Sequence, residues 1–214
     1  MRFLFDLDSP VMQFITRFCD IVVLNVVFLL TCIPIFTIGA ANAALYDVVF
    51  RMDTDREEKL LRTYFRAFRE NFRQGTVIWL GLLLFGIATF LNMTRFSNLG
   101  AYSYLLGYSL FIVSILVLVL EIFLFSYAFP LLSRFRNSTR NVVRNALLLS
   151  IGNLPKTLLL SIVNCFPWVL MLMNLYTFIR IGFIWIAAYF AAAAYFNSRV
   201  LMKIFDSLIP SQTP

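Results

Sequence analysis

Residues 96–120 read FSNLGAYSYLLGYSLFIVSILVLVL and carry no charged side chain. A helix needs about 20 predominantly apolar residues to cross a bilayer, so this stretch is long enough to do so. The apolar character continues beyond Glu121 to about Pro130, which predicts a long or tilted membrane-spanning helix over 104–130. This segment places the chain among integral membrane proteins.

Four further charge-free runs lie on either side of this segment, and each also reaches the length of a span. They cover 21–46, 74–94, 157–179 and 181–198. Of the 214 residues, 61% are hydrophobic and 14% are charged, whereas soluble proteins have about 25% charged residues. We therefore expect an all-α polytopic bundle in which residues 1–214 form a single integral membrane domain. The five expected spans are roughly 18–39, 75–94, 104–130, 155–173 and 178–199.

The basic residues predict the orientation of these spans. Of the 18 Lys and Arg residues, all but four fall after the first, third and fifth spans, mainly in segments 40–74 and 131–154. The positive-inside rule places these two segments in the cytoplasm, with amphipathic helices in them, so the N-terminus is outside the cell membrane and the C-terminus inside. The net charge of +7 is accordingly a topology signal and an attraction for anionic lipid. We expect no binding of nucleic acid.

The composition also excludes several kinds of chemistry. The chain has no histidine, which removes His-based triads and His-ligated metal sites. Its three cysteines, Cys19, Cys32 and Cys165, lie in apolar runs and are interpreted as small hydrophobic residues. No paired acids, nucleophile motif or phosphate-binding loop stands out. The sequence therefore predicts no catalytic residue, no metal and no cofactor, and the protein is not expected to be an enzyme.

Two motifs carry a family resemblance. The first is Asp20-Ile-Val-Val-Leu-Asn25 followed by Ile33-Pro34-Ile-Phe-Thr-Ile-Gly39-Ala-Ala, and the second is Phe68-Arg-Glu-Asn-Phe-Arg-Gln74. This arrangement resembles the YesL family of bacterial integral membrane proteins, whose molecular function is unassigned. Members are often encoded beside carbohydrate importers of the ABC class. The resemblance therefore implies a role near sugar uptake, and it supplies no catalytic residues.

The same motifs have structural explanations. Pro34 lacks an N–H group and is expected to break the first span near its cytoplasmic end. Gly39 and the alanines after it allow close backbone contact in a second helix over 39–52. Asn25 lies deep enough in the membrane to require an interhelical hydrogen bond. A kink with tight packing is one interpretation of this region, and a ligand site at the break is the other.

Residues 53–73 predict an amphipathic helix. Thr54 and Glu57 form a capping box. Apolar residues recur at helical spacing, and arginines follow one position later. The first set is Leu61, Tyr64, Phe65, Phe68 and Phe72, and the second is Arg62, Arg66, Arg69 and Arg73. This pattern is typical of a helix lying on the lipid surface, but arginine and aromatic residues are also enriched where proteins bind partners.

Glu121 and Asn164 are polar residues inside predicted spans. A charge in hydrocarbon is unfavourable, so the carboxyl group of Glu121 should face the bundle or be protonated. Lys156 or Asn164 would be its partner. Glu121 is then either a structural buried acid or a site that couples a proton or a substrate.

Two functions are consistent with this sequence. The first is a non-enzymatic accessory or regulatory component of a carbohydrate ABC importer, in contact with membrane lipid and with importer subunits. The alternative is a small-solute transporter in its own right, which would use Glu121 and the broken first span. The sequence sets no oligomeric state.

Overall fold

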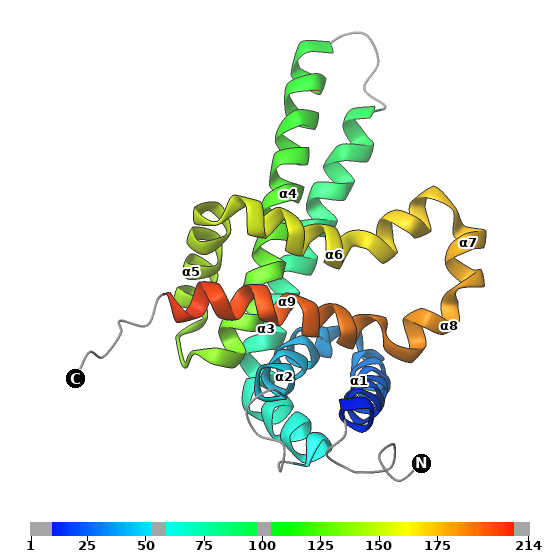
Figure 1. The fold of residues 1–214 in the computed structure, drawn as a ribbon. Helices are drawn as coiled ribbons and strands as arrows, with labels where there is room; N and C mark the ends of the chain where they lie inside the picture. The colour runs from blue at the N-terminus through cyan, green and yellow to red at the C-terminus, as the bar shows by residue number, and fades with distance from the viewer. Residues whose placement is uncertain (1–9, 53–58, 98–103, 208–214) are drawn as a thin grey trace.

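The computed structural model describes residues 10–52, 59–97 and 104–207. Within these ranges the chain is almost entirely helical and has no strand, which confirms the all-α class. Figure 1 labels the elements in chain order. They are α1 (Pro10–Cys32), the 3-10 turn η2 (Ile35–Thr37), α2 (Ile38–Arg51), α3 (Leu60–Ser97), α4 (Tyr104–Arg134), α5 (Thr139–Gly152), α6 (Leu154–Met173), α7 (Leu175–Arg180), α8 (Gly182–Ile184), the π-helical turn η4 (Trp185–Tyr189) and α9 (Phe190–Asp206).

Four helices in the described part of the chain are long and apolar enough to cross a membrane. These candidate spans are Val11–Cys32, Leu60–Thr94, Gly107–Arg134 and Leu154–Met173. They indicate a multi-pass membrane protein, as the sequence predicts. The expected fifth span, 178–199, is not one continuous helix, because it is divided among α7, α8, η4 and α9.

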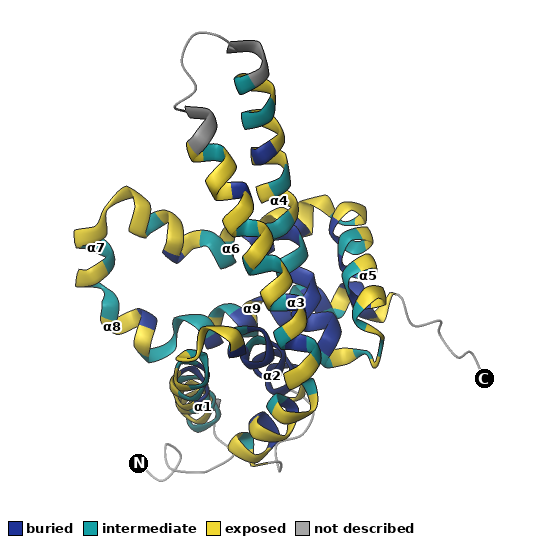
Figure 2. Ribbon diagram, turned by 180° about the vertical axis from the view of Figure 1, so that it is seen from behind, coloured by how far each residue is buried: buried dark blue, intermediate teal, exposed yellow. Residues whose placement is uncertain are grey.

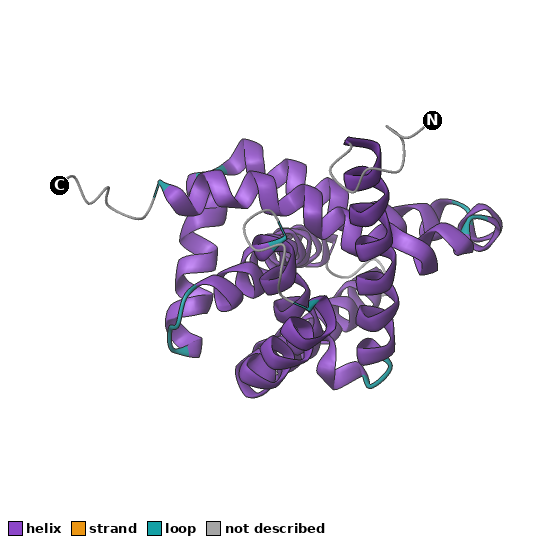
Figure 3. Ribbon diagram, turned by 60° about the horizontal axis from the view of Figure 1, so that its bottom comes forward, coloured by secondary structure: helices purple, strands orange, loops and turns teal. Residues whose placement is uncertain are grey.

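The helices also differ from the expected bundle in their directions. α3 and α4 form an antiparallel pair whose far end projects from the rest of the molecule, while α6 and α9 cross this pair (Figure 1). α1 is seen end-on in Figure 1 and along its length in Figure 3. Many exposed positions lie on the candidate spans (Figure 2). Apolar side chains on such faces favour contact with lipid over contact with water.

The centre of the fold is α2. Eleven of its 14 residues are buried, and it packs against α1, α3, α4 and α9. Pro34 lies between the end of α1 and η2, where the sequence predicts a break. The hydroxyl oxygen of Thr37 lies 2.5 Å from the carbonyl oxygen of Thr31 and 2.6 Å from that of Pro34. Donation to Thr31 satisfies a carbonyl that the end of α1 leaves unpaired, whereas the carbonyl of Pro34 already accepts from the backbone N–H of Thr37.

Glycines bring the backbones of α2 and α3 into direct contact. A Cβ atom on Gly39 would lie 2.2 Å from the carbonyl oxygen of Gly75 and 2.7 Å from the Cβ of Trp79. A Cβ on Gly75 would lie 2.9 Å from the Cα of Ala40. Only glycine fits at these two positions without moving a helix, and this close crossing fixes how α3 lies against the core.

The predicted amphipathic helix over 53–73 is not a separate element. Its described part, from Leu60, is the beginning of α3, which continues without a break to Ser97. The predicted capping box at Thr54 and Glu57 lies outside the described residues. Because an α-helix rises 1.5 Å per residue, the 38 residues of α3 extend over about 57 Å, almost twice the thickness of the hydrocarbon core.

Candidate functional sites

Asn25 joins α1 to the π-helical turn. Its side chain is completely buried. The Nδ2 group donates to the carbonyl oxygens of Trp185 (3.0 Å) and Ile186 (2.7 Å), and Oδ1 accepts from the backbone N–H of Ala191 (2.9 Å). A π-helical turn disturbs the regular backbone hydrogen bonds. Asn25 therefore supplies partners for these backbone groups, which is the interhelical bond that its depth in the predicted span called for.

Asn164 belongs to a second polar cluster, which connects four helices. Its Nδ2 group donates to Ser126 Oγ on α4 (3.1 Å), and its Oδ1 accepts from Asn197 Nδ2 on α9 (2.8 Å). Asn197 Nδ2 also lies 3.4 Å from the hydroxyl group of Tyr46 on α2. The Oδ1 atom of Asn197 is buried and has no hydrogen-bond partner among the described residues. Sequence reasoning missed Asn197, since nothing in its local pattern distinguishes it from other polar residues near span ends.

Glu121 does not contact either of the partners expected for it. Its Oε1 atom instead lies 3.4 Å from the hydroxyl group of Thr89 on α3. Its Oε2 atom lies beside Gly86, where an added Cβ would be 3.3 Å away. Lys156 lies at an exposed position near the start of α6, and Asn164 bonds within its own cluster. The carboxyl group therefore links α4 to α3.

A cavity of about 730 Å³ brings Glu121 and Asn164 to one site. Residues from α1, α2, α3, α4, α6, η4 and α9 line it, and most of them are apolar or aromatic. Asn42 is a further polar residue in the lining, and no Lys or Arg of the described chain contributes to it. Asn25 is not part of the cavity wall. This volume lies within the range of pockets that hold small organic ligands.

The beginning of α3 presents a mixed surface of arginine and aromatic residues. Tyr64 is fully buried and shares a hydrogen bond with Thr31 Oγ1 (2.6 Å), and Phe68 packs against the core. By contrast, 52% of Phe65 and 38% of Phe72 are exposed. The predicted aromatic face is thus divided into an inner half that holds α3 in place and an outer half. The outer strip of α3 comprises the exposed residues Leu61, Arg62, Phe65, Arg66, Arg69, Phe72 and Arg73.

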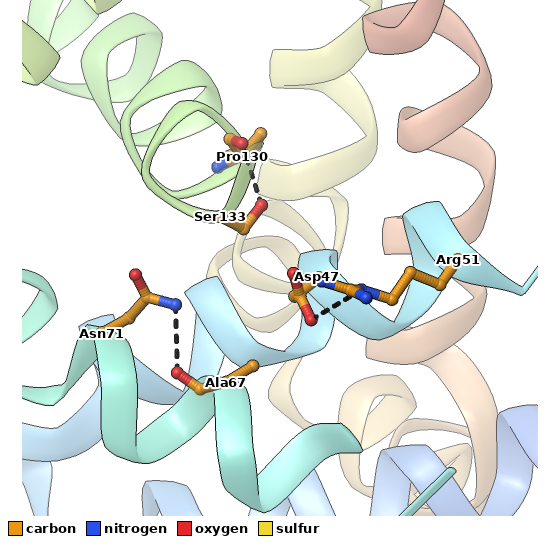
Figure 4. A network of polar contacts seen from close by, with 6 residues as sticks. All are labelled: Asp47, Arg51, Ala67, Asn71, Pro130 and Ser133. Atoms are coloured by element: carbon orange, nitrogen blue, oxygen red, sulfur yellow. Dashed lines mark hydrogen bonds and ion pairs between the residues drawn. The ribbon is translucent and has the colours of Figure 1, made fainter. Parts of the chain in front are cut away.

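Asp47 lies where α2 meets α3, and it pairs with Arg51 at 3.1 Å (Figure 4). Burial raises the pKa of Asp47 above its usual value, although the charges of Arg51 and of Arg66 on α3 act in the opposite direction. Desolvation therefore outweighs the ion pair at this position. Arg66 is thus part of the outer strip and also influences the charge of a buried group.

The second predicted basic segment forms α5. This helix buries Val142, Ala146 and Ser150, which are spaced four residues apart and define one inward face. Arg140 and Arg144 are exposed. Gln74 Nε2 donates to the carbonyl oxygen of Asn137 (3.1 Å), so the segment before α5 is tied to α3 just beyond the outer strip.

Residues 21–93 match the model of a family described as "Protein of unknown function, DUF624". The matched region runs from the middle of α1 through α2 to near the end of α3, and so includes the break at Pro34, the contact between Gly39 and Gly75, and the outer strip of α3. No curated protein and no solved structure matches the chain. Over this region the chain is therefore similar to an uncharacterised family, which is consistent with its resemblance to YesL-like proteins.

Proposed function

We propose that this protein is a non-enzymatic accessory or regulatory component of a carbohydrate ABC importer in the cell membrane, and that the outer strip of α3 binds the importer. The direction of α3 carries this proposal. The part of α3 from Gly75 to Thr94 is long enough to cross the hydrocarbon core by itself. The outer strip precedes it on the same uninterrupted helix. A helix that continues along the direction of a span projects away from the membrane and does not lie flat on it.

The composition of the outer strip supports a protein partner. Arginine and large aromatic residues contribute most of the binding energy at many protein interfaces. Phe65 and Phe72 are exposed beside four arginines, and exposure of such rings to water is unfavourable unless a partner covers them. The positive-inside rule puts this strip in the cytoplasm. The identity of the partner as a sugar importer rests on the YesL resemblance.

The proposed topology keeps the N-terminus outside and the C-terminus inside. Such a topology requires an odd number of crossings, so a fifth crossing must accompany the four candidate spans. η4 and α9 supply it in the proposal, because residues 181–198 carry no charge. Asn25 would satisfy the irregular backbone of this crossing, as interrupted membrane helices require.

The cavity favours a second candidate function, transport of a small solute other than a sugar. Its lining is mainly apolar, with few polar groups. The hydroxyl groups of a sugar would lose their hydrogen bonds to water and find few replacements there. The cavity is thus poorly suited to carrying a sugar through this chain, which is a further reason to assign sugar transport to a partner.

A charge reversal of the outer strip tests the accessory role. The triple variant Arg62→Glu, Arg69→Glu, Arg73→Glu leaves Arg66 to interact with Asp47. The matched control reverses Arg136, Arg140 and Arg144 at α5. We expect the α3 variant to insert at normal levels, to lose co-purification with the importer in mild detergent and to abolish sugar uptake, whereas the control retains both. Normal uptake by a correctly inserted α3 variant would refute the proposal.

A further inference from the structure

The cavity contains one acidic side chain and no basic one. Among the residues that line it, Glu121 is the sole acid, and the described lining includes no Lys or Arg. The other titratable side chains in the wall are Cys32 of α1, Tyr46 of α2, Cys165 of α6 and Tyr189 of η4, and all four are neutral when protonated. An ionised carboxylate in such apolar surroundings requires a cation close to it.

The hydrogen bonds of Glu121 are consistent with a protonated carboxyl group. The hydroxyl group of Thr89 has a single hydrogen but lies within reach of two oxygens, the carbonyl of Phe85 (3.0 Å) and Oε1 of Glu121 (3.4 Å). Both contacts are satisfied together when Thr89 donates to Phe85 and a protonated Glu121 donates to Thr89. Ionisation of Glu121 removes one of these two bonds.

The walls of the cavity are suited to an apolar body that carries a positive charge. Six of the lining residues are Phe or Trp from five different helices, namely Phe28, Trp79, Phe90, Phe125, Trp168 and Phe190. The faces of aromatic rings attract cations, and this attraction strengthens when water is excluded. A carboxyl group in a cavity with aromatic side chains in its lining therefore distinguishes a cation from a neutral or negative molecule of equal size.

We propose that the cavity binds a monovalent organic cation with a large apolar body, and that Glu121 is its counterion. When the cation enters, Glu121 releases its proton to water. The cation then takes the place of the proton beside the carboxylate, so the net charge of the cavity does not change. The binding site is separate from the outer strip of α3. The proposal therefore does not depend on the importer, and failure of either proposal leaves the other intact.

Binding of two probes to the full chain in a non-ionic detergent tests this inference. Tetraphenylphosphonium is an apolar cation, and tetraphenylborate has the same shape with the opposite charge. Equilibrium dialysis should show binding of the phosphonium and not of the borate, with quenching of the fluorescence of Trp79 and Trp168. Because one proton is exchanged, affinity for the phosphonium should rise by about tenfold per pH unit while Glu121 remains protonated in the free protein.

Glu121→Gln keeps the shape of the side chain and removes its charge. We expect it to weaken phosphonium binding by about tenfold or more and to abolish the pH dependence. Asp20→Asn is the matched control, since Asp20 lies on α1 and does not line the cavity; it should retain both properties. Equal binding of the two probes would indicate an apolar site for lipid chains and would overturn the proposal, as would pH-independent binding or no binding of the phosphonium. If Glu121→Gln does not fold, the comparison of probes and pH in the unmodified protein decides.

Discussion

Replacement of Gly39 by alanine should weaken the core although it adds only a methyl group. The new Cβ would lie 2.2 Å from the carbonyl oxygen of Gly75, and real Cβ contacts are essentially never shorter than 3.0 Å. The obstructing atoms are backbone and the Cβ of Trp79, so no flexible side chain can move aside. α2 and α3 must therefore separate along a contact that is buried on both helices. Overpacking of this kind destabilises proteins by about 1–3 kcal/mol.

Gly81→Ala, on the neighbouring helix α3, provides a control. Nothing lies within 4 Å of a Cβ built at Gly81, and alanine favours a helix over glycine by about 1 kcal/mol. We expect this variant to be as stable as the unmodified protein or slightly more stable. The two substitutions are chemically identical, but only Gly39→Ala meets a close contact, so the free energies of unfolding of the two variants should differ by about 1–4 kcal/mol.

Unfolding of the purified protein in mixed micelles, followed by circular dichroism as the denaturing detergent increases, would measure this difference. Gly75→Ala should lie between the other two variants, because its Cβ would be 2.9 Å from the Cα of Ala40. If Gly39→Ala and Gly81→Ala have the same stability, α2 and α3 do not pack with their backbones in contact, and the central packing argument is wrong.

Three further predictions concern other parts of the chain. Asn25→Ala should destabilise the protein by about 2–5 kcal/mol, since three buried hydrogen bonds in a membrane protein contribute about 0.6–1.7 kcal/mol each. Amide hydrogen exchange that becomes faster only in the π-helical turn would show that the lost stability comes from this contact. Because burial raises the pKa of Asp47 in the folded state, the free energy of unfolding should fall as pH rises through that raised pKa. Asp47→Asn should remove this pH dependence. If the free energies of unfolding of the two proteins differ by the same amount at every pH, the prediction is wrong. In a cysteine-free background, Tyr176→Cys should react with an impermeant thiol reagent outside intact cells and Ser138→Cys should not; the reverse labelling would invert the proposed topology.

Local properties of the sequence determined the class of this protein. Hydropathy sums contributions from neighbouring residues, so the apolar runs alone identify the helices that can span a membrane. The break at Pro34 is local as well, because the missing N–H and the ring act on the preceding turn. The small residues after Gly39 likewise indicated that another backbone would approach, although they did not say which one.

The sequence interpretation failed where neighbours in space are distant along the chain. The sequence predicts an amphipathic helix over 53–73 and a separate span over 75–94, but α3 continues through Gly75, where its backbone lies against Ala40. The region 178–199 has the composition of a span, but its backbone is interrupted at η4. Hydropathy measures how favourably each residue transfers into lipid, and it contains no information on the regularity of the helix.

The partners of the buried polar groups were decided only by the tertiary structure. Asn25 bonds to backbone atoms about 160 positions away in the chain, and Glu121 contacts Thr89 on a neighbouring helix. A polar residue inside a span reveals that it needs a partner, because an unpaired group in hydrocarbon is unfavourable. Which group becomes that partner, and whether a cavity opens beside it, follows from how the helices cross, which depends on contacts such as that between Gly39 and Gly75.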